Sequence, residues 1–145
     1  MKVFLGGTCN GSTWREKLMP ELDKLGIEYF NPVVKDWTSE CMKEEERQKK
    51  ICDTHLYVIT PKMKGVYSIA EVVEAANTDP GNTIFCVLPT SDEATFDRGE
   101  LKSMYAVERL VSTKGVIIAR CLKDIVEILE YRKKFTFDWR PAYED

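Results

Sequence analysis

The feature that most constrains the fold is a regular alternation of short apolar runs with longer segments of helical periodicity. The apolar runs lie at residues 3–5, 27–30, 56–60, 83–88 and 116–119. In the segments between them, apolar residues recur every three or four positions, as Trp14, Leu18 and Leu22 do. Strands that alternate with helices in this way are typical of βαβ units and of a parallel sheet.

Glycine or proline ends most of the apolar runs, as Gly6, Pro61 and Pro89 do. The pattern predicts helices near residues 14–25, 39–51, 69–76, 101–111 and 125–129, and hence a single domain over residues 1–145. We expect a three-layer, flavodoxin-like (Rossmann-like) α/β fold whose five parallel strands lie in the order 2-1-3-4-5. In such sheets ligands bind beyond the carboxyl ends of the strands, near strands 1 and 3. The loops 6–12, 61–68 and 89–99, flanked by 31–38, are therefore where a site is expected.

Charge and cysteine content exclude several classes of protein. The net charge of −3 comes from 21 basic and 24 acidic residues that are well mixed, which disfavours binding to a nucleic acid polymer. The five cysteines are scattered, without a Cys-x-x-Cys pair, so neither a disulfide framework nor a metal site is expected. No run approaches the ~20 apolar residues of a membrane helix. We expect a cytoplasmic protein that does not bind a membrane.

The first loop places small, flexible residues where a strand becomes a helix. It comprises Gly6, Gly7, Thr8, Cys9 and Asn10, continuing to residue 12. Free N–H groups at a helix start hold a phosphate or a sugar hydroxyl, although the spacing matches neither Gly-x-Gly-x-x-Gly nor a P-loop. A structural alternative is a turn in which Thr13 and Glu16 form a capping box. The two are compatible, and we expect ligand contact here.

Glu71 is the strongest candidate for chemistry. It lies where the loop after the third strand enters its helix, and a glutamate at that edge is able to attack the anomeric carbon of a sugar. Spacing alone favours a structural alternative, because Ser68-x-x-Glu71 is itself a capping box. In the loop after the fourth strand, we interpret Asp92 and Asp97 as solvated turn residues, with contact to a base or ribose as the alternative.

An ordered series of short motifs bears on the choice between a catalytic and a capping role for Glu71. In chain order it comprises residues 3–8, Trp14-Arg15, Asn31-Pro32, Asp36-Trp37, Asp53 before the strand 56–61, Gly65, and Ser68 to Glu71. Over the first ~90 residues this series resembles the nucleoside 2-deoxyribosyltransferase-like family, which also includes nucleoside 5′-monophosphate N-glycosidases.

The resemblance assigns roles to particular residues. It implies that Glu71 is the nucleophile and that a carboxylate near Glu45 orients it or protonates the leaving base. Two family features are missing, since Phe4 or Leu5 replaces an aromatic hydroxyl on strand 1 and Lys64-Gly65 replaces an aspartate before the nucleophile. Tyr67 is the candidate to supply a hydroxyl instead.

The remaining candidates are contacts to substrate. The predicted substrate-binding residues are Gly6, Gly7, Thr8, Cys9, Asn10, Asn31, Asp36, Trp37, Gly65 and Ser68. Trp37 either stacks on a base or packs in the core. Arg15, Lys62, Lys64 and Arg98 are candidates for a phosphate contact, and convergence of two of them on the first loop indicates a nucleotide.

The implied reaction is double displacement through Glu71, without a metal or an organic cofactor. A second base as acceptor makes the protein a transferase, and water makes it a hydrolase that includes the nucleoside 5′-monophosphate N-glycosidases. A non-catalytic nucleotide-binding module and, from the fold alone, a flavin carrier are the alternatives of other classes. The resemblance also implies a homo-oligomer, and the aromatic tail 135–145 is expected to pack on this domain or on a neighbouring subunit.

Overall fold

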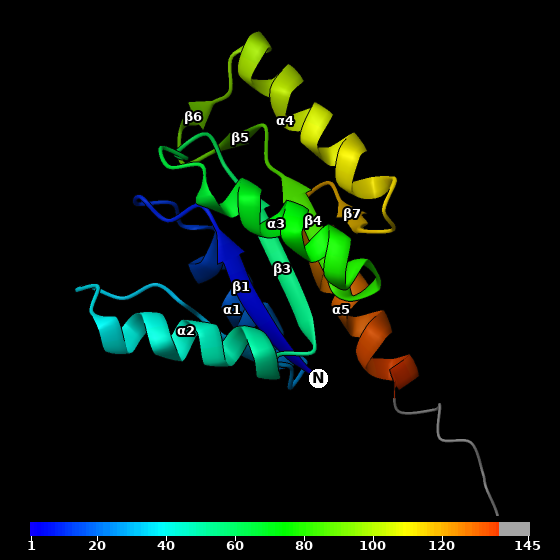
Figure 1. Cartoon of the computed structure of the whole chain (residues 1–145). Coiled ribbons are helices and arrows are strands. Elements are labelled where there is room, and N and C mark those ends of the chain that lie inside the picture. The colour runs from blue at the N-terminus through cyan, green and yellow to red at the C-terminus, as the bar shows by residue number, and fades with distance from the viewer. Residues whose placement is uncertain (137–145) are drawn as a thin grey trace, which may run out of the picture.

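The computed structural model describes residues 1–136 and contains the predicted parallel sheet. Its strands are β1 (Lys2–Gly7), β2 (Glu28–Phe30), β3 (Thr54–Ile59), β4 (Thr83–Val87) and β7 (Ile117–Ala119), in the order β2-β1-β3-β4-β7. All four pairings are parallel. Since β7 is the fifth strand of this sheet, the predicted order 2-1-3-4-5 is confirmed (Figure 1).

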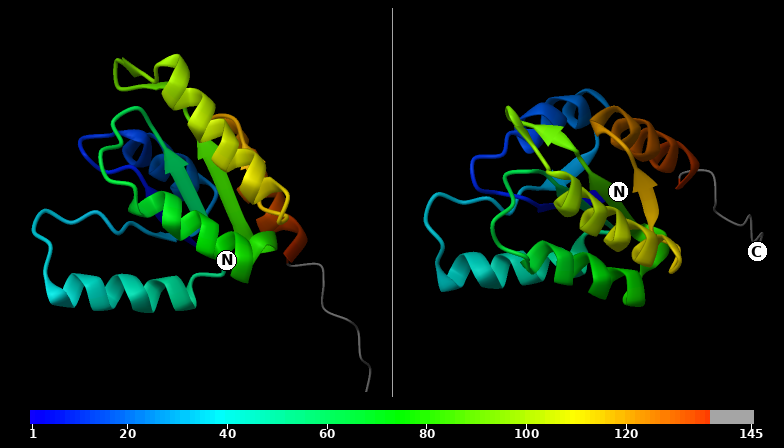
Figure 2. Two further views of the ribbon diagram at one scale, coloured as in Figure 1. Left: turned by 45° about the horizontal axis from the view of Figure 1, so that its top comes forward. Right: turned by 90° about the horizontal axis from the view of Figure 1, so that it is seen from above.

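Helices cover both faces of the sheet, as the view from above in Figure 2 shows. The helices α1 (Trp14–Lys24) and α5 (Leu122–Thr136) lie on one face. The helices α2 (Ser39–Ile51), α3 (Tyr67–Thr78) and α4 (Arg98–Ser112) lie on the other, and a 3₁₀ turn, η1 (Pro80–Asn82), leads into β4. The three-layer architecture is therefore as predicted.

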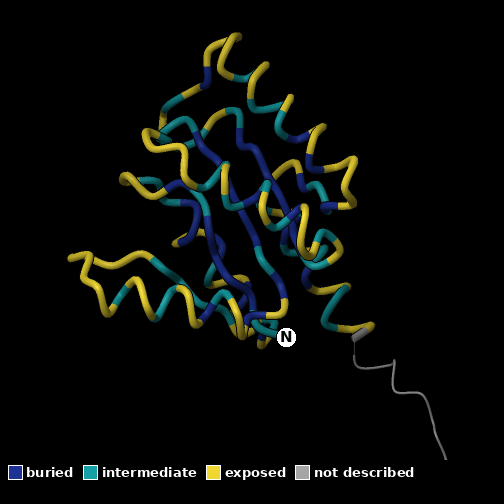
Figure 3. Tube along the Cα trace, viewed as in Figure 1, coloured by how far each residue is buried: buried dark blue, intermediate teal, exposed yellow. Residues whose placement is uncertain are grey.

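The two faces of the sheet carry separate apolar cores because side chains alternate along each strand. Leu5, Leu56 and Ile84 point to the α1–α5 face, whereas Phe4, Tyr57 and Phe85 point to the α3–α4 face. In Figure 3 the central strands are buried along most of their length, while most of α2 is exposed. Parallel strands buried on both faces explain why the sequence shows continuous apolar runs instead of alternation.

A two-stranded hairpin was not predicted. After β4 the chain forms β5 (Thr90–Ser91) and β6 (Ala94–Thr95), an antiparallel pair joined by Asp92 and Glu93. Both turn residues have positive φ, 54° and 61°, as a tight hairpin turn requires. Such short, polar strands carry no apolar alternation, so the loop 89–99 appeared only as a turn.

Gly7 is fixed by close packing where β1 meets the first loop. Its φ is +123°, and a Cβ atom there would lie 2.0 Å from the backbone oxygen of Val58. We expect Gly7→Ala to lower the free energy of unfolding by about 3 kcal/mol or more, because the backbone of β1 or β3 must shift. Gly11→Ala is the matched control: its φ is +72°, but nothing lies within 4 Å, so a cost of about 1 kcal/mol is expected. Urea denaturation of both variants checks the difference, and equal losses would contradict it.

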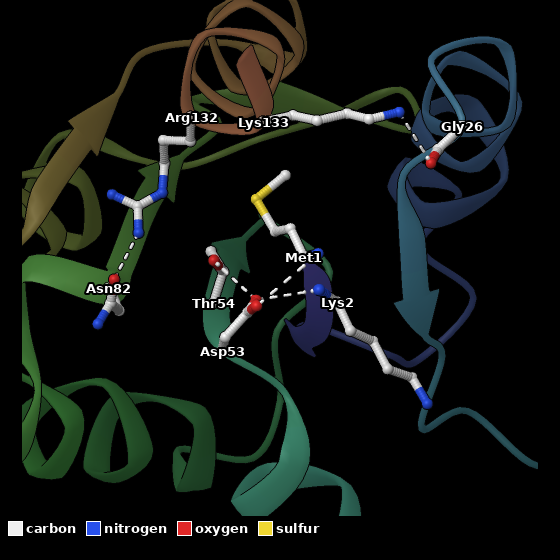
Figure 4. Close-up of polar contacts among 8 residues, drawn as sticks. All are labelled: Met1, Lys2, Gly26, Asp53, Thr54, Asn82, Arg132 and Lys133. Carbon is white, nitrogen blue, oxygen red and sulfur yellow. Dashed lines mark hydrogen bonds and ion pairs between the residues drawn. The ribbon is translucent and has the colours of Figure 1, made fainter. Parts of the chain in front are cut away.

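The amino edge of the sheet is held by polar contacts shown in Figure 4. The Lys2 N–H donates to Asp53 Oδ1 at 3.0 Å, and the terminal ammonium lies 3.9 Å from Asp53 Oδ2. Arg132 donates to Asn82 Oδ1 at 2.6 Å, which ties α5 to the start of β4. Asp53 therefore has a structural role at the edge opposite the predicted site.

Candidate active site

A cavity of about 300 Å³ lies at the carboxyl ends of β1 and β3, where ligands of this fold bind. Its walls come from β1 and the loop after it, from the loop after β2, and from α2 and α3. The lining residues are Phe4, Gly6, Gly7, Cys9, Arg15, Pro32, Val33, Val34, Trp37, Glu45, Tyr67, Ser68 and Glu71. The cavity therefore brings together residues from four parts of the sequence that were predicted separately.

Glu71 faces this cavity from the second turn of α3. The helix begins at Tyr67, with Val66 as N-cap and without a side-chain capping bond. Ser68 consequently lies inside the helix, and the predicted Ser68–Glu71 capping box is wrong. Glu71 also lies beyond the free N–H groups of the first turn, so these groups do not stabilise its charge. The structural alternative for Glu71 is thereby removed.

Lys49 supplies the positive charge that the helix start does not. Its Nζ lies 2.5 Å from Glu71 Oε2 and 3.3 Å from Glu45 Oε1, so it bridges a carboxylate on α3 and one on α2. It also lies 5.5 Å from the ring centroid of Phe4 and 5.7 Å from that of Tyr67, within the range of cation–π attraction. Two carboxylates thus share one ammonium group beside the cavity.

The surroundings change the acidity of both members of the pair. Burial raises the pKa of Glu71, and Lys49 offsets only part of this rise, while Glu45 adds to it. For Lys49, burial alone would lower the pKa, but the contacts with Glu71 and Glu45 outweigh burial and raise it. Opposite charges favour the ionised form of each partner. Lys49 therefore favours the ionised form of the Glu71 carboxylate, against the effect of burial.

Lys49 was not predicted as a site residue, because it is one of many charged residues on α2. The spacing of Glu45 and Lys49 is i,i+4, which places both on one helix face. That signal was present, but nothing in the sequence indicated that this face meets α3. Gln48, next to Lys49, is also buried and not solvated.

The first loop is held from behind by Arg15. Its guanidinium donates to the backbone oxygens of Leu5, Thr8 and Gly7 at 3.0, 2.8 and 3.2 Å, and the side chain is 3% exposed. Thr8 is buried too, and its hydroxyl oxygen accepts a hydrogen bond from the Thr60 N–H. Both side chains shape the loop, and Arg15 also lines the cavity together with Gly6, Gly7 and Cys9.

The loop after β2 forms one side of the cavity mouth. Trp37 is 58% exposed and lines the cavity, so packing in the core is wrong and its ring is free to stack on a planar ligand. Val33 and Val34 line the cavity beside it. Asn31 instead accepts a hydrogen bond from the Val33 N–H at 3.0 Å, and Asp36 is exposed outside the lining.

The other predicted substrate contacts also fall into two groups, those that line the cavity and those that do not. Tyr67 and Ser68 line the cavity, and Tyr67 is largely exposed at its rim. Asn10, Gly65, Lys64 and Arg98 are exposed and do not line the cavity, and the half-buried Lys62 does not line it either. Among the cations proposed for a phosphate, Arg15 alone contacts the first loop, and it does so through backbone carbonyls.

Asp92 is not a solvated turn residue. Its carboxylate accepts hydrogen bonds from the Thr13 N–H at 3.1 Å, from the Ser12 and Ser91 hydroxyls at 3.3 and 3.1 Å, and from the Thr13 hydroxyl. These bonds, the Thr13 hydroxyl first, lower the pKa of Asp92 to about 2. The predicted Thr13–Glu16 capping box is therefore wrong, because Thr13 makes no side-chain cap and Asp92 takes that place.

Asp97 also has a structural task. It caps α4 in a capping box, accepting from the Glu100 N–H at 2.8 Å while its own N–H donates to Glu100. Asp97 is therefore solvated, as predicted, but it caps a helix instead of lying in a turn.

A second hollow, of about 440 Å³, continues between α2 and α3 on the other side of the ion pair. Lys49, His55, Tyr57 and Glu74 line it, and it shares Tyr67 and Glu71 with the cavity. His55 contacts the Lys49 backbone oxygen at 2.7 Å, so the chain's single histidine lies away from the cavity. The Lys49–Glu71 pair thus forms part of the wall between the two hollows.

The fold and this carboxylate-lined cavity define an α/β protein with a ligand site at the carboxyl edge of a parallel sheet. A family model described as nucleoside 2-deoxyribosyltransferase like matches residues 1–90. The chain therefore belongs to the nucleoside 2-deoxyribosyltransferase-like family. No curated protein and no solved structure gives a match. Within residues 1–136, none of the helices combines the length and apolar character needed to cross a bilayer.

Proposed function

We propose that the protein is an enzyme that cleaves or exchanges the N-glycosidic bond of a nucleoside through a covalent glycosyl-Glu71 intermediate. The observation that supports this most directly is the placement of Glu71. It is half-buried, it lines the cavity at the carboxyl edge, and it is paired with a lysine where no capping role accounts for it. A carboxylate so held is suited to attack on an anomeric carbon.

In the first step one Glu71 oxygen forms a bond to C1′ while the C1′–N bond to the base breaks and its electron pair leaves with the base. The departing base takes up a proton, for which the family resemblance makes Glu45 the candidate donor; Glu45 lines the same cavity and contacts Lys49. In the second step a free base or a water attacks C1′ and releases Glu71. A base as acceptor gives deoxyribosyl transfer, and water gives hydrolysis.

The cavity walls are suited to the base and the sugar of a nucleoside. Trp37, Val33 and Val34 offer an apolar and aromatic surface for a planar base, whereas Gly6 and Gly7 offer close approach to the backbone. By family resemblance we also propose that the enzyme is a cytoplasmic homo-oligomer. The aromatic tail from residue 137 onward, expected to take part in packing, lies outside the described residues.

The test is incubation of the purified protein with a panel of nucleosides, with and without a second free base, followed by chromatography. Release of free base is expected, and a new nucleoside in the presence of the added base identifies a transferase. If nothing is turned over but a nucleoside raises the melting temperature, the protein is a non-catalytic binding module instead.

A further inference from the structure

The buried hydroxyl of Tyr57 makes no hydrogen bond within residues 1–136. Its side chain is 3% exposed, and it lines the hollow between α2 and α3 together with Lys49 and Glu71. Buried hydroxyls are normally paired, because an unpaired one costs free energy. The uncommitted hydroxyl of Tyr57, beside the proposed nucleophile, therefore calls for a functional explanation.

Packing fixes the Tyr57 ring against strand β1. Tyr57 is paired in register with Gly6, and a Cβ atom on Gly6 would lie 2.6 Å from two carbon atoms of the ring. The ring centroid lies 6.4 Å from that of Phe4. Because Gly6 has no side chain, the ring can lie against the strand, and its hydroxyl is held in one place. A group that is held in this way loses little freedom when it forms a hydrogen bond.

Glu71 offers an acceptor in the same hollow. Its Oε2 is buried and, apart from the Lys49 ammonium at 2.5 Å, has no donor in the part of the chain that the structure describes. A carboxylate oxygen has two lone pairs, so Oε2 is able to accept a second bond. Hydrogen bonds of catalytic groups are often long in the free enzyme and tighten when the substrate binds. An unused donor and an acceptor with room for it thus border one hollow.

The hydroxyl of Tyr57 remains a donor near neutral pH. Burial raises the pKa of Tyr57, and the negative charges of Glu71, Glu45 and Glu74 raise it further, with Glu71 first among them. Because the interaction of two charges weakens with distance, Glu71 is the carboxylate that acts most strongly on this hydroxyl. The other titratable groups that face Glu71 are Glu45, Glu46 and Lys49 from α2, His55 from β3, and Tyr67 and Glu74 from α3.

We propose that Tyr57 is a positioning residue whose hydroxyl donates to the Glu71 carboxylate when a nucleoside binds and so directs the other carboxylate oxygen toward C1′. This inference rests on the proposed glycosidic function. Tyr57 does not line the cavity, so it acts through Glu71 and not on the substrate. With Lys49 and Tyr57 holding one oxygen of Glu71, the second is left to form the bond to C1′.

The experiment compares the pH profiles of wild type, Tyr57→Phe and Tyr105→Phe with the best nucleoside of the panel. The pH dependence of kcat reports the enzyme–substrate complex, whereas that of kcat/KM reports the free enzyme. A hydrogen bond to an ionised carboxylate lowers its pKa. We therefore expect Tyr57→Phe to move the acid limb of kcat to higher pH by about half a pH unit or more and to lower kcat by about threefold or more at pH 6. The acid limb of kcat/KM should keep its wild-type position.

Tyr105→Phe is the matched control, because Tyr105 packs against the same core from α4 and lines neither the hollow nor the cavity. It should leave both limbs in place. The melting temperature of free Tyr57→Phe should equal or exceed that of wild type, because the hydroxyl that is lost is unpaired there. An acid limb of kcat that stays in place in Tyr57→Phe overturns the inference, and a lower melting temperature would then assign the hydroxyl to stability alone.

A second measurement keeps the inference separate from the proposed function. The pKa of Glu71 is followed by NMR of protein that carries isotope-labelled glutamate, and Glu71→Gln identifies the signal. The probe is a C-nucleoside, whose carbon-linked base is not released. With this probe bound, Tyr57→Phe should show a higher Glu71 pKa than wild type. An equal pKa overturns the inference, while base release by wild type leaves the glycosidic function standing. If wild type releases no base from any nucleoside, that function fails, and the pKa comparison alone decides whether Tyr57 holds Glu71.

Discussion

Replacing Glu71 with glutamine is expected to lower the rate of base release by about a thousandfold or more. Glutamine has nearly the same shape but cannot form the covalent bond to C1′, and loss of a nucleophile removes most of the rate enhancement in enzymes that use covalent catalysis. The measurement is steady-state kinetics with the best nucleoside of the panel, read by chromatography.

The fold should survive this change. Ser68 does not cap α3, so no capping bond is lost, and Lys49 keeps Glu45 as a partner at 3.3 Å. We expect the free energy of unfolding to change by no more than about 1 kcal/mol. Glu74→Gln is the matched control because Glu74 lies one turn along α3, exposed, and lines the neighbouring hollow instead of the cavity. Full activity of Glu71→Gln would contradict the role of Glu71 as the nucleophile.

Replacing Lys49 with methionine is expected to raise the pH at which activity is lost on acidification. The attacking carboxylate must be deprotonated, so the rate is present above the pKa of Glu71 and is lost as the pH falls through it. Burial already raises that pKa, and Lys49 is the group that lowers it. Without the ammonium, Glu71 and Glu45 also repel each other, so the pKa rises further and less of the nucleophile is ionised.

The expected result is a shift of the acid limb of kcat/KM to higher pH, with a loss of about tenfold or more at pH 6 and a smaller loss at pH 9. Lys49→Arg should keep the limb near its wild-type position because the charge is kept. Lys50→Met is the control: Lys50 is exposed on the same helix turn, and its loss should leave the limb in place. An equal loss at every pH would show that Lys49 supports packing and not the charge of Glu71.

The sheet and its helices were predictable because the sequence expresses them locally. Each strand of the parallel sheet is a short apolar run, and each helix has a stripe of its own, such as Trp14, Leu18 and Leu22 on α1. Local patterns are also why the site loops were found: the carboxyl edge follows from strand order alone. Gly6, Gly7, Trp37 and Glu71 all proved to line one cavity.

The features that were missed depend on residues far apart in the chain. Asp92 accepts from the N-cap residue Thr13, which lies 79 residues earlier in the chain, and no local pattern links the two. Lys49 is able to pair with Glu71 only because α2 and α3 lie side by side. The Ser68 capping box failed for a different reason, since α3 starts one residue before Ser68, and spacing alone does not choose between neighbouring starts.

The core on the α1–α5 face limits how far this chain can be truncated. Trp14, Leu18 and Leu22 share that core with Ala119, Ile125 and Leu129, which lie well beyond the family-matched residues 1–90. Expressed alone, residues 1–90 would leave α1 with an uncovered apolar stripe and without its cap at Asp92. The segment that carries the family's signature is therefore no autonomous folding unit, and shortened versions for engineering should retain α5 and the β5–β6 turn.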